Sequence, residues 1–170
     1  MSLITFLTDF GSTDGFSGIL RGVIWSICPE AKFADISHEI PPQDIRKGAY
    51  TLQRAYSYFP PGTVHLAVVD PGVGTERRPM VARLGEWFFV GPDNGLFTCV
   101  YEDAEANLWN MEFIRLTNSR YFLPTVSTSF HGRDIFAPAA AHLARGVSMS
   151  ELGTVLRDPV RLLLPHPEKT

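Results

Sequence analysis

The feature that most constrains the fold is a short run, Val64 to Val69, which is apolar at every position except His65. Strands that are apolar almost throughout are typical of parallel sheets, because helices cover such sheets on both faces. The run ends abruptly in the turn sequence Asp70-Pro71-Gly72. It therefore predicts a buried strand at the centre of an α/β fold.

The segments around this run alternate between strand and helix patterns. Leu3 to Thr8 is a short β-rich run, and apolar residues recur at helical spacing from Phe16 to Ile27. We further predict a strand at Lys32 to Ile36, a helix from about Asp44 to Phe59, a hairpin of Met80 to Leu84 with Trp87 to Val90, a strand at Ala106 to Leu116, a loop from Thr125 to Asp134 and a helix from Ile135 to Arg145. This order predicts a three-layer α/β fold, with a mixed, mainly parallel β-sheet flanked by helices.

Composition and charge narrow the class of protein. The chain has 170 residues, of which 45% are apolar and 19% charged, as is typical of one globular domain. Its net charge is −3 and no basic block is longer than Arg77-Arg78, so we expect no nucleic acid partner. Apolar runs such as Trp87 to Val90 are too short to cross a bilayer, and the N-terminus does not resemble a secretory signal. We therefore expect no membrane partner and a cytoplasmic location, and because Cys28 and Cys99 lie in no Cys/His cluster, no zinc site is predicted.

Polar loops that follow predicted strands are the candidate sites, because ligands of open α/β sheets bind at the carboxyl ends of strands. Asp9 comes directly after the first strand, where its carboxylate could accept hydrogen bonds from a ribose diol. From the residue alone, a turn or a helix N-cap explains Asp9 better. Asp14, just before the first predicted helix, is an even stronger candidate for a cap.

Asp70 is open to two interpretations, an Asp-Pro turn or a functional carboxylate. Arg77 lies seven residues further along, across a glycine-rich turn that lets it fold back on Asp70. A buried Asp paired with Arg stays ionised and could orient a water, but the pair could equally be structural. Among the five histidines, His131 has the most suggestive setting, between Phe130 and Gly132, although a lone histidine in a loop is more often structural.

Several common catalytic motifs are missing from the sequence. Gly72-Val73-Gly74 begins like a dinucleotide-binding fingerprint, but Arg77 occupies the position of the third glycine. No G-x-S-x-G nucleophile elbow is present, which disfavours an α/β-hydrolase. No Asp/His cluster has the spacing of a metal site either.

Four loop motifs occur in order along the chain, at Thr8 to Asp14, Val69 to Thr75, Gly91 to Gly95 and Ser129 to Asp134. Together they resemble the motifs of the S-adenosylmethionine (SAM) hydroxide adenosyltransferases, adenosine-forming hydrolases related to fluorinating and chlorinating enzymes. The resemblance extends from Leu3 to about Pro159. It implies that SAM is a substrate, hydrolysed to adenosine and methionine, with no cofactor and no metal.

The resemblance also implies a mechanism. Water attacks the ribose 5′-carbon while methionine leaves as a neutral thioether, so the nucleophile has to be oriented and deprotonated. By motif, the activating set of the family corresponds to Asp70, Arg77 and His131. Asp70 would position the water, and Arg77 and His131 would stabilise the developing hydroxide.

Substrate-binding positions follow from the same resemblance. Asp9 would bind the ribose diol and Asp14 would lie near the methionine amine, while Ser129 and Phe130 would line the pocket around the 5′-carbon. The other substrate-binding candidates are Phe10, Gln43 and Gly132.

Two positions favour activated water over a halide. Halogenating relatives have Tyr at the position of Asp70, and many have a halide-binding Ser at the position of Gly132. Gln43 stands where halogenases often have Trp, so its role is open.

The end of the chain departs most from the family. Members continue into a smaller β-rich domain, so we predict an N-terminal α/β domain at residues 1–158 and the start of a linker at residues 159–170. The apolar run in this linker either folds back onto the domain or lacks its partner. In the family the site lies between the second domain and a neighbouring subunit of a trimer. The resemblance therefore implies a homotrimer for the full-length enzyme and weak or no turnover for this chain.

Two alternatives stay open. The chain could be a catalytically silent domain that binds adenosine or another nucleoside, keeping Asp9 but doing no chemistry. It could also be an assembly domain whose main surviving surface is the trimer contact.

Overall fold

Seven strands build one mixed sheet in a computed structural model that describes residues 2–165. The strands are β1 (Leu3–Thr8), β2 (Lys32–Ser37), β3 (Val64–Val68), β4 (Pro79–Leu84), β5 (Trp87–Pro92), β6 (Met111–Leu116) and β7 (Gly153–Val155). Their order across the sheet is β2-β1-β3-β5-β4-β6-β7. The first four strands in this order pair in parallel, and the remaining pairs are antiparallel.

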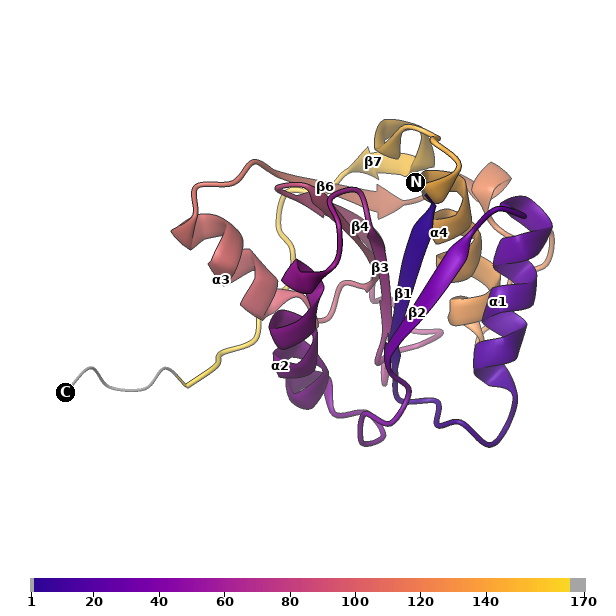
Figure 1. Ribbon diagram of the computed structural model, residues 1–170, viewed down its shortest axis with the longest axis horizontal. Coiled ribbons are helices and arrows are strands. Elements are labelled where there is room, and N and C mark those ends of the chain that lie inside the picture. Colours follow the sequence, from indigo (N-terminus) through magenta and orange to yellow (C-terminus); the bar gives the residue numbers. More distant parts are fainter. Residues whose placement is uncertain (1, 166–170) are drawn as a thin grey trace.

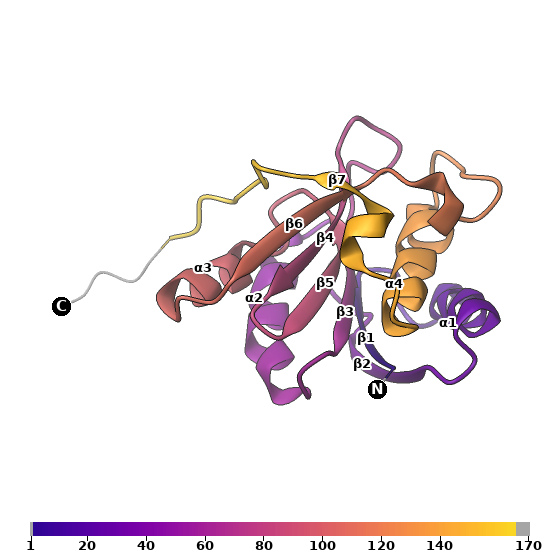
Figure 2. The same cartoon turned by 90° about the horizontal axis from the view of Figure 1, so that it is seen from above.

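Helices cover both faces of the sheet and make the three layers visible in Figures 1 and 2. They are α1 (Phe16–Ile27), α2 (Ile45–Ala55), α3 (Thr98–Ala106) and α4 (Ala137–Ala144). Helices α1 and α4 pack on one face, and α2 and α3 pack on the other. The predicted three-layer α/β fold with a mixed sheet is therefore confirmed. None of the helices within residues 2–165 is long and apolar enough to span a membrane.

Strand β3 has the central position that its apolar sequence predicts. All five of its residues are buried, and it lies between β1 and β5. Its neighbouring residues Leu66 and Ala67 belong to different hydrophobic cores, one on each face of the sheet. Because both faces of β3 are covered, the polar residues that can reach a ligand from this strand lie beyond its end.

The predicted strand at residues 106–116 is partly wrong. Ala106 is the last residue of α3, the chain then turns at Leu108 with φ of 56°, and β6 begins only at Met111. Helix α3 is not predicted from the sequence, because its start, Thr-Cys-Val-Tyr, has a composition that favours strands. Strand β7 is not predicted either, because its three residues are too few to show an alternating pattern.

Three further boundaries differ from the predictions. The second helix ends at Ala55 and continues as a 3-10 turn over Tyr56–Tyr58. The predicted loop at residues 125–134 ends early, because a π-helical turn begins at Gly132 and leads into α4. Asp14 does not cap α1: the N-cap position belongs to Gly15, with φ of 73° and no side-chain cap.

After β7 the chain crosses to the α3 side of the domain as an extended segment, which we call the C-terminal strap (residues 157–162). The backbone N–H of Val160 donates to Asp93 Oδ1 at 2.8 Å, and that of Leu162 donates to Thr98 Oγ1 at 2.9 Å. A Cβ at Gly95 would lie 2.5 Å from Leu162 Cγ, so the strap packs closely on this loop. Of the two options for the apolar run, Leu162 folds back onto the domain, whereas the side chain of Leu163 is 96% exposed. Residues 166–170 of the predicted linker lie outside the described residues.

Candidate active site

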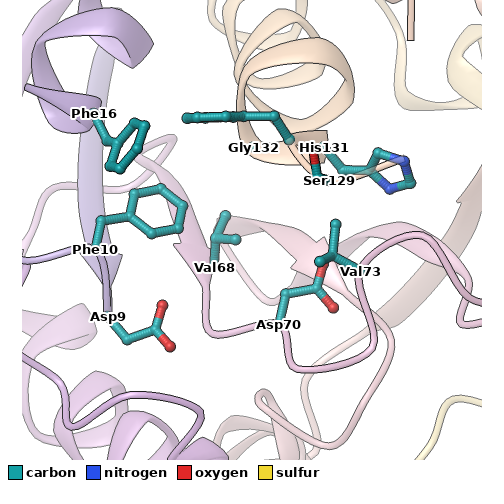
Figure 3. Close-up of a pocket in the computed structure, with 10 residues that line it drawn as sticks. Asp9, Phe10, Phe16, Val68, Asp70, Val73, Ser129, His131 and Gly132 are labelled. Carbon is teal, nitrogen blue, oxygen red and sulfur yellow. The ribbon is translucent and has the colours of Figure 1, made fainter. Parts of the chain in front are cut away.

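A cavity of about 220 Å³ opens at the carboxyl ends of β1 and β3 (Figure 3). These strands are parallel neighbours, so the residues that follow them, Asp9 and Asp70, lie at the same edge of the sheet. The third wall comes from the loop that leads into the π-helical turn before α4. Ten residues line the cavity: Asp9, Phe10, Phe16, Val68, Asp70, Val73, Ser129, Phe130, His131 and Gly132.

Asp70 and Arg77 form a buried ion pair at the base of this site. Their side chains are only 5% and 9% exposed. Arg77 Nε lies 2.9 and 3.0 Å from the two carboxylate oxygens of Asp70, and Arg77 Nη2 also donates to Oδ2. Such a two-pronged contact fixes the plane of the carboxylate. The Asp70 carboxylate still lines the cavity, so the pair is both an ion pair and a candidate for chemistry.

His131 completes a connected chain of three side chains. Its Nδ1 lies 2.9 Å from Arg77 Nη2, and its Nε2 lies 2.9 Å from the carbonyl oxygen of Ser127. A guanidinium only donates hydrogen bonds and a carbonyl only accepts them. The arrangement therefore fits the neutral tautomer with the proton on Nε2. The structure thus joins Asp70 and His131 through Arg77, which hydrogen-bonds to both, a connection that the residues alone could not establish.

Two contacts hold the loops that carry these residues. A Cβ at Gly74 would overlap the backbone carbonyl oxygen of Thr128, so the loop after β3 and the loop before α4 touch without a side chain between them. Gly74 also has φ of 78°, a conformation that favours glycine. From the other side, Asn94 Nδ2 donates to the carbonyl oxygen of Val69 at 2.8 Å, next to Asp70. The Gly91 to Gly95 motif therefore supports the site without lining it.

Asp9 faces the opposite side of the cavity from His131 (Figure 3). Its Oδ2 accepts a hydrogen bond of 2.7 Å from the backbone N–H of Gln43, whose φ of 65° is unusual for a residue other than glycine. Phe10, Phe16 and Phe130 form an aromatic wall, with ring centroids 4.9 to 6.3 Å apart. The cavity thus joins two carboxylates to an apolar wall, an arrangement suited to a ligand with a polar and an apolar part.

The structure places the predicted site residues in four ways. Most of them line the cavity, and Arg77 lies directly behind Asp70. Gln43 touches the site through its backbone alone, and Asp14 is exposed and does not line the cavity. The lining residues that the sequence analysis did not single out are Phe16, Val68 and Val73. In the sequence, Phe16 is only one residue of the apolar stripe of α1, and Val68 is only one residue of a buried strand.

Within residues 2–165, the structure contains no group of three or more His, Cys, Asp or Glu side chains able to hold a metal ion. The acidic residues at this edge instead pair with donors of the protein itself. Asp70 pairs with Arg77, and Asp9 accepts from a backbone N–H.

Comparison with known proteins gives a consistent set of relatives. The family described as SAM hydroxide adenosyltransferase N-terminal domain matches residues 4–153. The chain is 44% identical over 170 residues to the (R)-S-adenosyl-L-methionine hydrolase of Salinispora tropica, covering 96% of this chain and 63% of that protein. It is 46% identical over 157 residues to the protein of the same name from Thermus thermophilus, covering 90% of this chain and 61% of the relative.

More distant and structural relatives agree with this grouping. A fluorinase of an Actinoplanes species is 28% identical over 190 residues, covering 97% of this chain and 62% of the fluorinase. The crystal structure of an uncharacterised conserved protein from Thermotoga maritima superposes with a TM-score of 0.92 at 41% identity, covering 96% of this chain and 62% of that one. The chain thus spans less than two thirds of the length of each of these relatives. It belongs to the SAM hydroxide adenosyltransferase family, whose N-terminal domain it matches over most of its length.

Proposed function

We propose that this protein takes part in the hydrolysis of (R)-S-adenosyl-L-methionine to adenosine and L-methionine, and that this chain carries the water-activating half of the site. Two relatives at 44% and 46% identity bear the name of this hydrolase. The observation that carries the proposal is the buried Asp70 carboxylate, which faces the cavity while Arg77 holds it from behind. The names of these relatives specify the R epimer, which refines the SAM hydrolysis expected from the motifs.

In the proposed reaction, a water hydrogen-bonded to Asp70 attacks the ribose 5′-carbon. The carbon–sulfur bond breaks, its electron pair stays on sulfur, and the sulfonium becomes the neutral thioether of methionine. The new carbon–oxygen bond gives the 5′-hydroxyl of adenosine, and the displaced proton passes to Asp70 and then to solvent. Because the thioether leaves without needing a proton, orienting the water is the main task of the protein.

Arg77 and His131 divide the remaining work in this proposal. Both ring nitrogens of His131 already have partners, Arg77 and the Ser127 carbonyl. His131 therefore acts mainly by holding the guanidinium, and Arg77 supplies the positive charge next to the developing hydroxide. In a site shielded from bulk water, such a fixed charge stabilises a transition state more than it would in solution.

The rest of the cavity provides the substrate contacts in this proposal. The free carboxylate oxygen of Asp9 accepts from the ribose diol, while Phe10 and Phe130 pack against apolar parts of the substrate. Ser129 and Gly132 border the space next to the 5′-carbon. Asp14 and Gln43 do not line the cavity. The contacts proposed for them, with the methionine amine and with the substrate, therefore require either a movement of the chain or additional residues that extend the cavity.

The proposal extends to the complete enzyme. We propose that it is a homotrimer, and that a further β-rich domain supplies the other half of the site. This chain alone then releases methionine slowly or not at all.

A direct assay tests the function. The purified 170-residue protein and the complete Thermus thermophilus relative are incubated with each SAM epimer, and chromatography quantifies adenosine and methionine. We expect both products in equal amounts, faster from the R epimer, with a much lower rate for this chain. Rapid hydrolysis by the 170-residue protein would contradict the proposed half-site.

A titration calorimeter separates the alternatives. Adenosine that binds without any release of methionine, even from the R epimer over long incubation, would favour the silent nucleoside-binding domain. Sedimentation of the same sample tests whether the chain forms trimers, as the assembly alternative requires.

A further inference from the structure

Asp134 is a completely buried carboxylate that does not line the cavity. Its Oδ2 accepts from the backbone N–H of Ser127 at 2.8 Å and from the Ser127 hydroxyl at 2.7 Å. Its Oδ1 accepts from Arg133 Nε at 2.7 Å, and Arg133 Nη2 lies 3.3 Å from Oδ2. Ser127 Oγ also accepts from the Phe130 N–H at 3.0 Å, so the hydrogen bonds of this cluster all lie within residues 127–134.

We propose that Asp134 is a positioning residue that acts through Ser127: it aims the Ser127 carbonyl at His131, and this selects the tautomer that lets His131 hold Arg77 against Asp70. The catalytic consequence rests on the function proposed above. The selection of the tautomer does not, because it involves only groups of the folded protein.

Asp134 holds residue Ser127 at two points, the backbone N–H and the side-chain hydroxyl, next to the carbonyl that faces His131. Two hydrogen bonds from Ser127, one from the backbone and one from the side chain, meet the same carboxylate oxygen. Burial by itself would raise the pKa of Asp134, but the hydrogen bonds from Arg133 and Ser127 outweigh it and lower that pKa. An ionised carboxylate accepts hydrogen bonds more strongly than a neutral amide, so Ser127 has little freedom to rotate.

The Ser127 carbonyl determines which nitrogen of His131 carries the proton. With Ser127 fixed, its carbonyl oxygen lies 2.9 Å from His131 Nε2, and this contact is a hydrogen bond only if Nε2 carries the proton. The lone pair is then on Nδ1, 2.9 Å from Arg77 Nη2, where it accepts a hydrogen bond. The other tautomer would set an N–H of the ring against the N–H of the guanidinium. It would also leave the carbonyl facing a lone pair.

A purely structural role for Asp134 is the competing explanation. Asp134 also belongs to the π-helical turn, and its own N–H donates to the Phe130 carbonyl. If it served only to stabilise this turn, removing its charge would lower stability and leave the His131 ring unchanged. A measurement of the tautomer therefore separates the two roles.

The test uses two-dimensional proton–nitrogen NMR of the histidine rings, recorded on the 170-residue protein at about pH 8, where an ordinary histidine is neutral. His131→Gln identifies the signals of His131. The wild-type protein is expected to show almost only the Nε2–H form. In Asp134→Asn and Asp134→Ala, the ratio of the two tautomers is expected to fall at least about tenfold, since a fixed carbonyl contact is lost.

Two further variants make the result decisive. Asp103→Asn is the control: Asp103 accepts from Tyr56 and Gln53 on the other face of the sheet, so its loss is expected to leave the His131 ring unchanged. Ser127→Ala removes the hydroxyl contacts with Asp134 and with the Phe130 N–H but keeps the backbone contact with Asp134, and it is expected to shift the ratio in the same direction, by less. A folded Asp134→Ala with an unchanged Nε2–H form would overturn the proposal. If Asp134→Ala does not fold, an unchanged ring in Ser127→Ala and Asp134→Asn would overturn it instead.

This readout needs no substrate, so it stands apart from the function proposed above. If the tautomer shifts in the Asp134 variants but the wild-type protein hydrolyses neither SAM epimer, the role of Asp134 is supported and the hydrolase function is contradicted. If the tautomer stays unchanged in the Asp134 variants while the wild-type protein hydrolyses SAM, the hydrolase function is supported and the role of Asp134 is contradicted.

Discussion

Single residues at the edge of the sheet set what the cavity can do. Asp70 is held in one plane by Arg77, and its carboxylate is almost fully buried. A water bound there would meet a fixed acceptor rather than a mobile surface carboxylate. The chemistry proposed for the protein therefore depends on one side chain more than on any other.

Replacing Asp70 tests this dependence. Asp70→Asn keeps the shape but removes the charge that accepts a proton, so we expect the rate of methionine release from (R)-SAM to fall by about 100-fold or more. Chromatography of timed reactions measures it, in the complete relative at the corresponding position if this chain turns over too slowly. Glu76→Gln, which changes an exposed carboxylate in the same loop, is the matched control and should keep its rate.

His65 gives a prediction about stability. This histidine is completely buried on β3, its Nδ1 lies 2.6 Å from Thr5 Oγ1, and its Nε2 has no hydrogen-bond partner. Burial lowers the pKa of His65 from 6.5 to about 3. Between about pH 3 and pH 6.5, His65 is therefore protonated in the unfolded chain and neutral in the folded chain. The stability contributed by neutral His65 is present above pH 6.5 and is lost as the pH falls towards 3.

The expected loss is roughly 3 kcal/mol between pH 6.5 and pH 4, from 1.36 kcal/mol per pKa unit. Urea unfolding at several pH values measures it. In His65→Leu this part of the pH dependence should disappear, although the variant loses the bond to Thr5. An identical pH dependence in both proteins would show that another group is responsible.

At the residue scale, the sequence predicted some partners and missed others for a clear reason. The Asp70–Arg77 pair is local, so a glycine-rich turn between the two residues was enough to predict it. His131 lies 54 residues from Arg77, and only the resemblance to the family linked them. Ser127 and Asp134 were missed as site residues, because serine and aspartate in a polar loop are ordinary and their contact with His131 passes through a carbonyl group.

At the scale of elements, two loops must touch for the site to exist. The loop after β3 and the loop before α4 meet where Gly74 lies against the Thr128 carbonyl. Neither loop alone carries all the residues proposed to activate water, since Asp70 and Arg77 come from one loop and His131 from the other. The contact between them is therefore as important as the strands that position them.

Gly74→Ala tests this contact. The added methyl group meets the Thr128 carbonyl, so we expect the loops to separate, the His131–Arg77 contact to weaken and stability to fall by about 1–3 kcal/mol. Gly146→Ala is the control, because Gly146 has φ of 102° but open space around its Cβ position. Urea unfolding and the histidine ring signals report both effects. If the two variants behaved alike, backbone conformation alone would explain the change.

Helices and strands could be predicted where burial leaves a recognisable pattern of apolar residues along the sequence, and could not be predicted where it leaves none. Helix α1 shows a clear apolar stripe, and β3 is apolar throughout, so both were predicted within a residue or two. Helix α3 is buried at five of its nine positions, including four in succession from Thr98 to Tyr101, which hides its stripe. Strand β7 owes its existence to pairing with β6, a tertiary contact that no local pattern encodes.

At the scale of the whole molecule, the C-terminal strap ties the end of the described chain to the edge of the sheet. Arg78 contacts both Asp93 and Asp158, and Asp93 in turn accepts from the Val160 N–H. Asp93 is only 4% exposed, so these partners take the place of water around its carboxylate. The strap is thus anchored by a buried carboxylate and not only by surface contacts.

Removing the anchor should cost more than removing a surface pair. Arg78→Ala leaves the Asp93 carboxylate buried without its cation, and we expect a loss of about 2–4 kcal/mol in the free energy of unfolding. Arg161→Ala, the matched control on the strap, breaks an exposed pair with Glu105 and should cost about 1 kcal/mol or less. Urea unfolding of both variants gives the comparison, and equal losses would argue against Asp93 as the anchor.

The adjacent residues Arg77 and Arg78 grip different parts of the molecule. Arg77 holds Asp70 and His131, while Arg78 holds Asp93 and the strap at Asp158. A force applied to the strap would therefore reach Arg78 through Asp158. Arg78 is the direct neighbour in the chain of Arg77, which holds Asp70. In this fold, a single peptide bond separates the residue that anchors the strap from the residue that holds the Asp70 carboxylate.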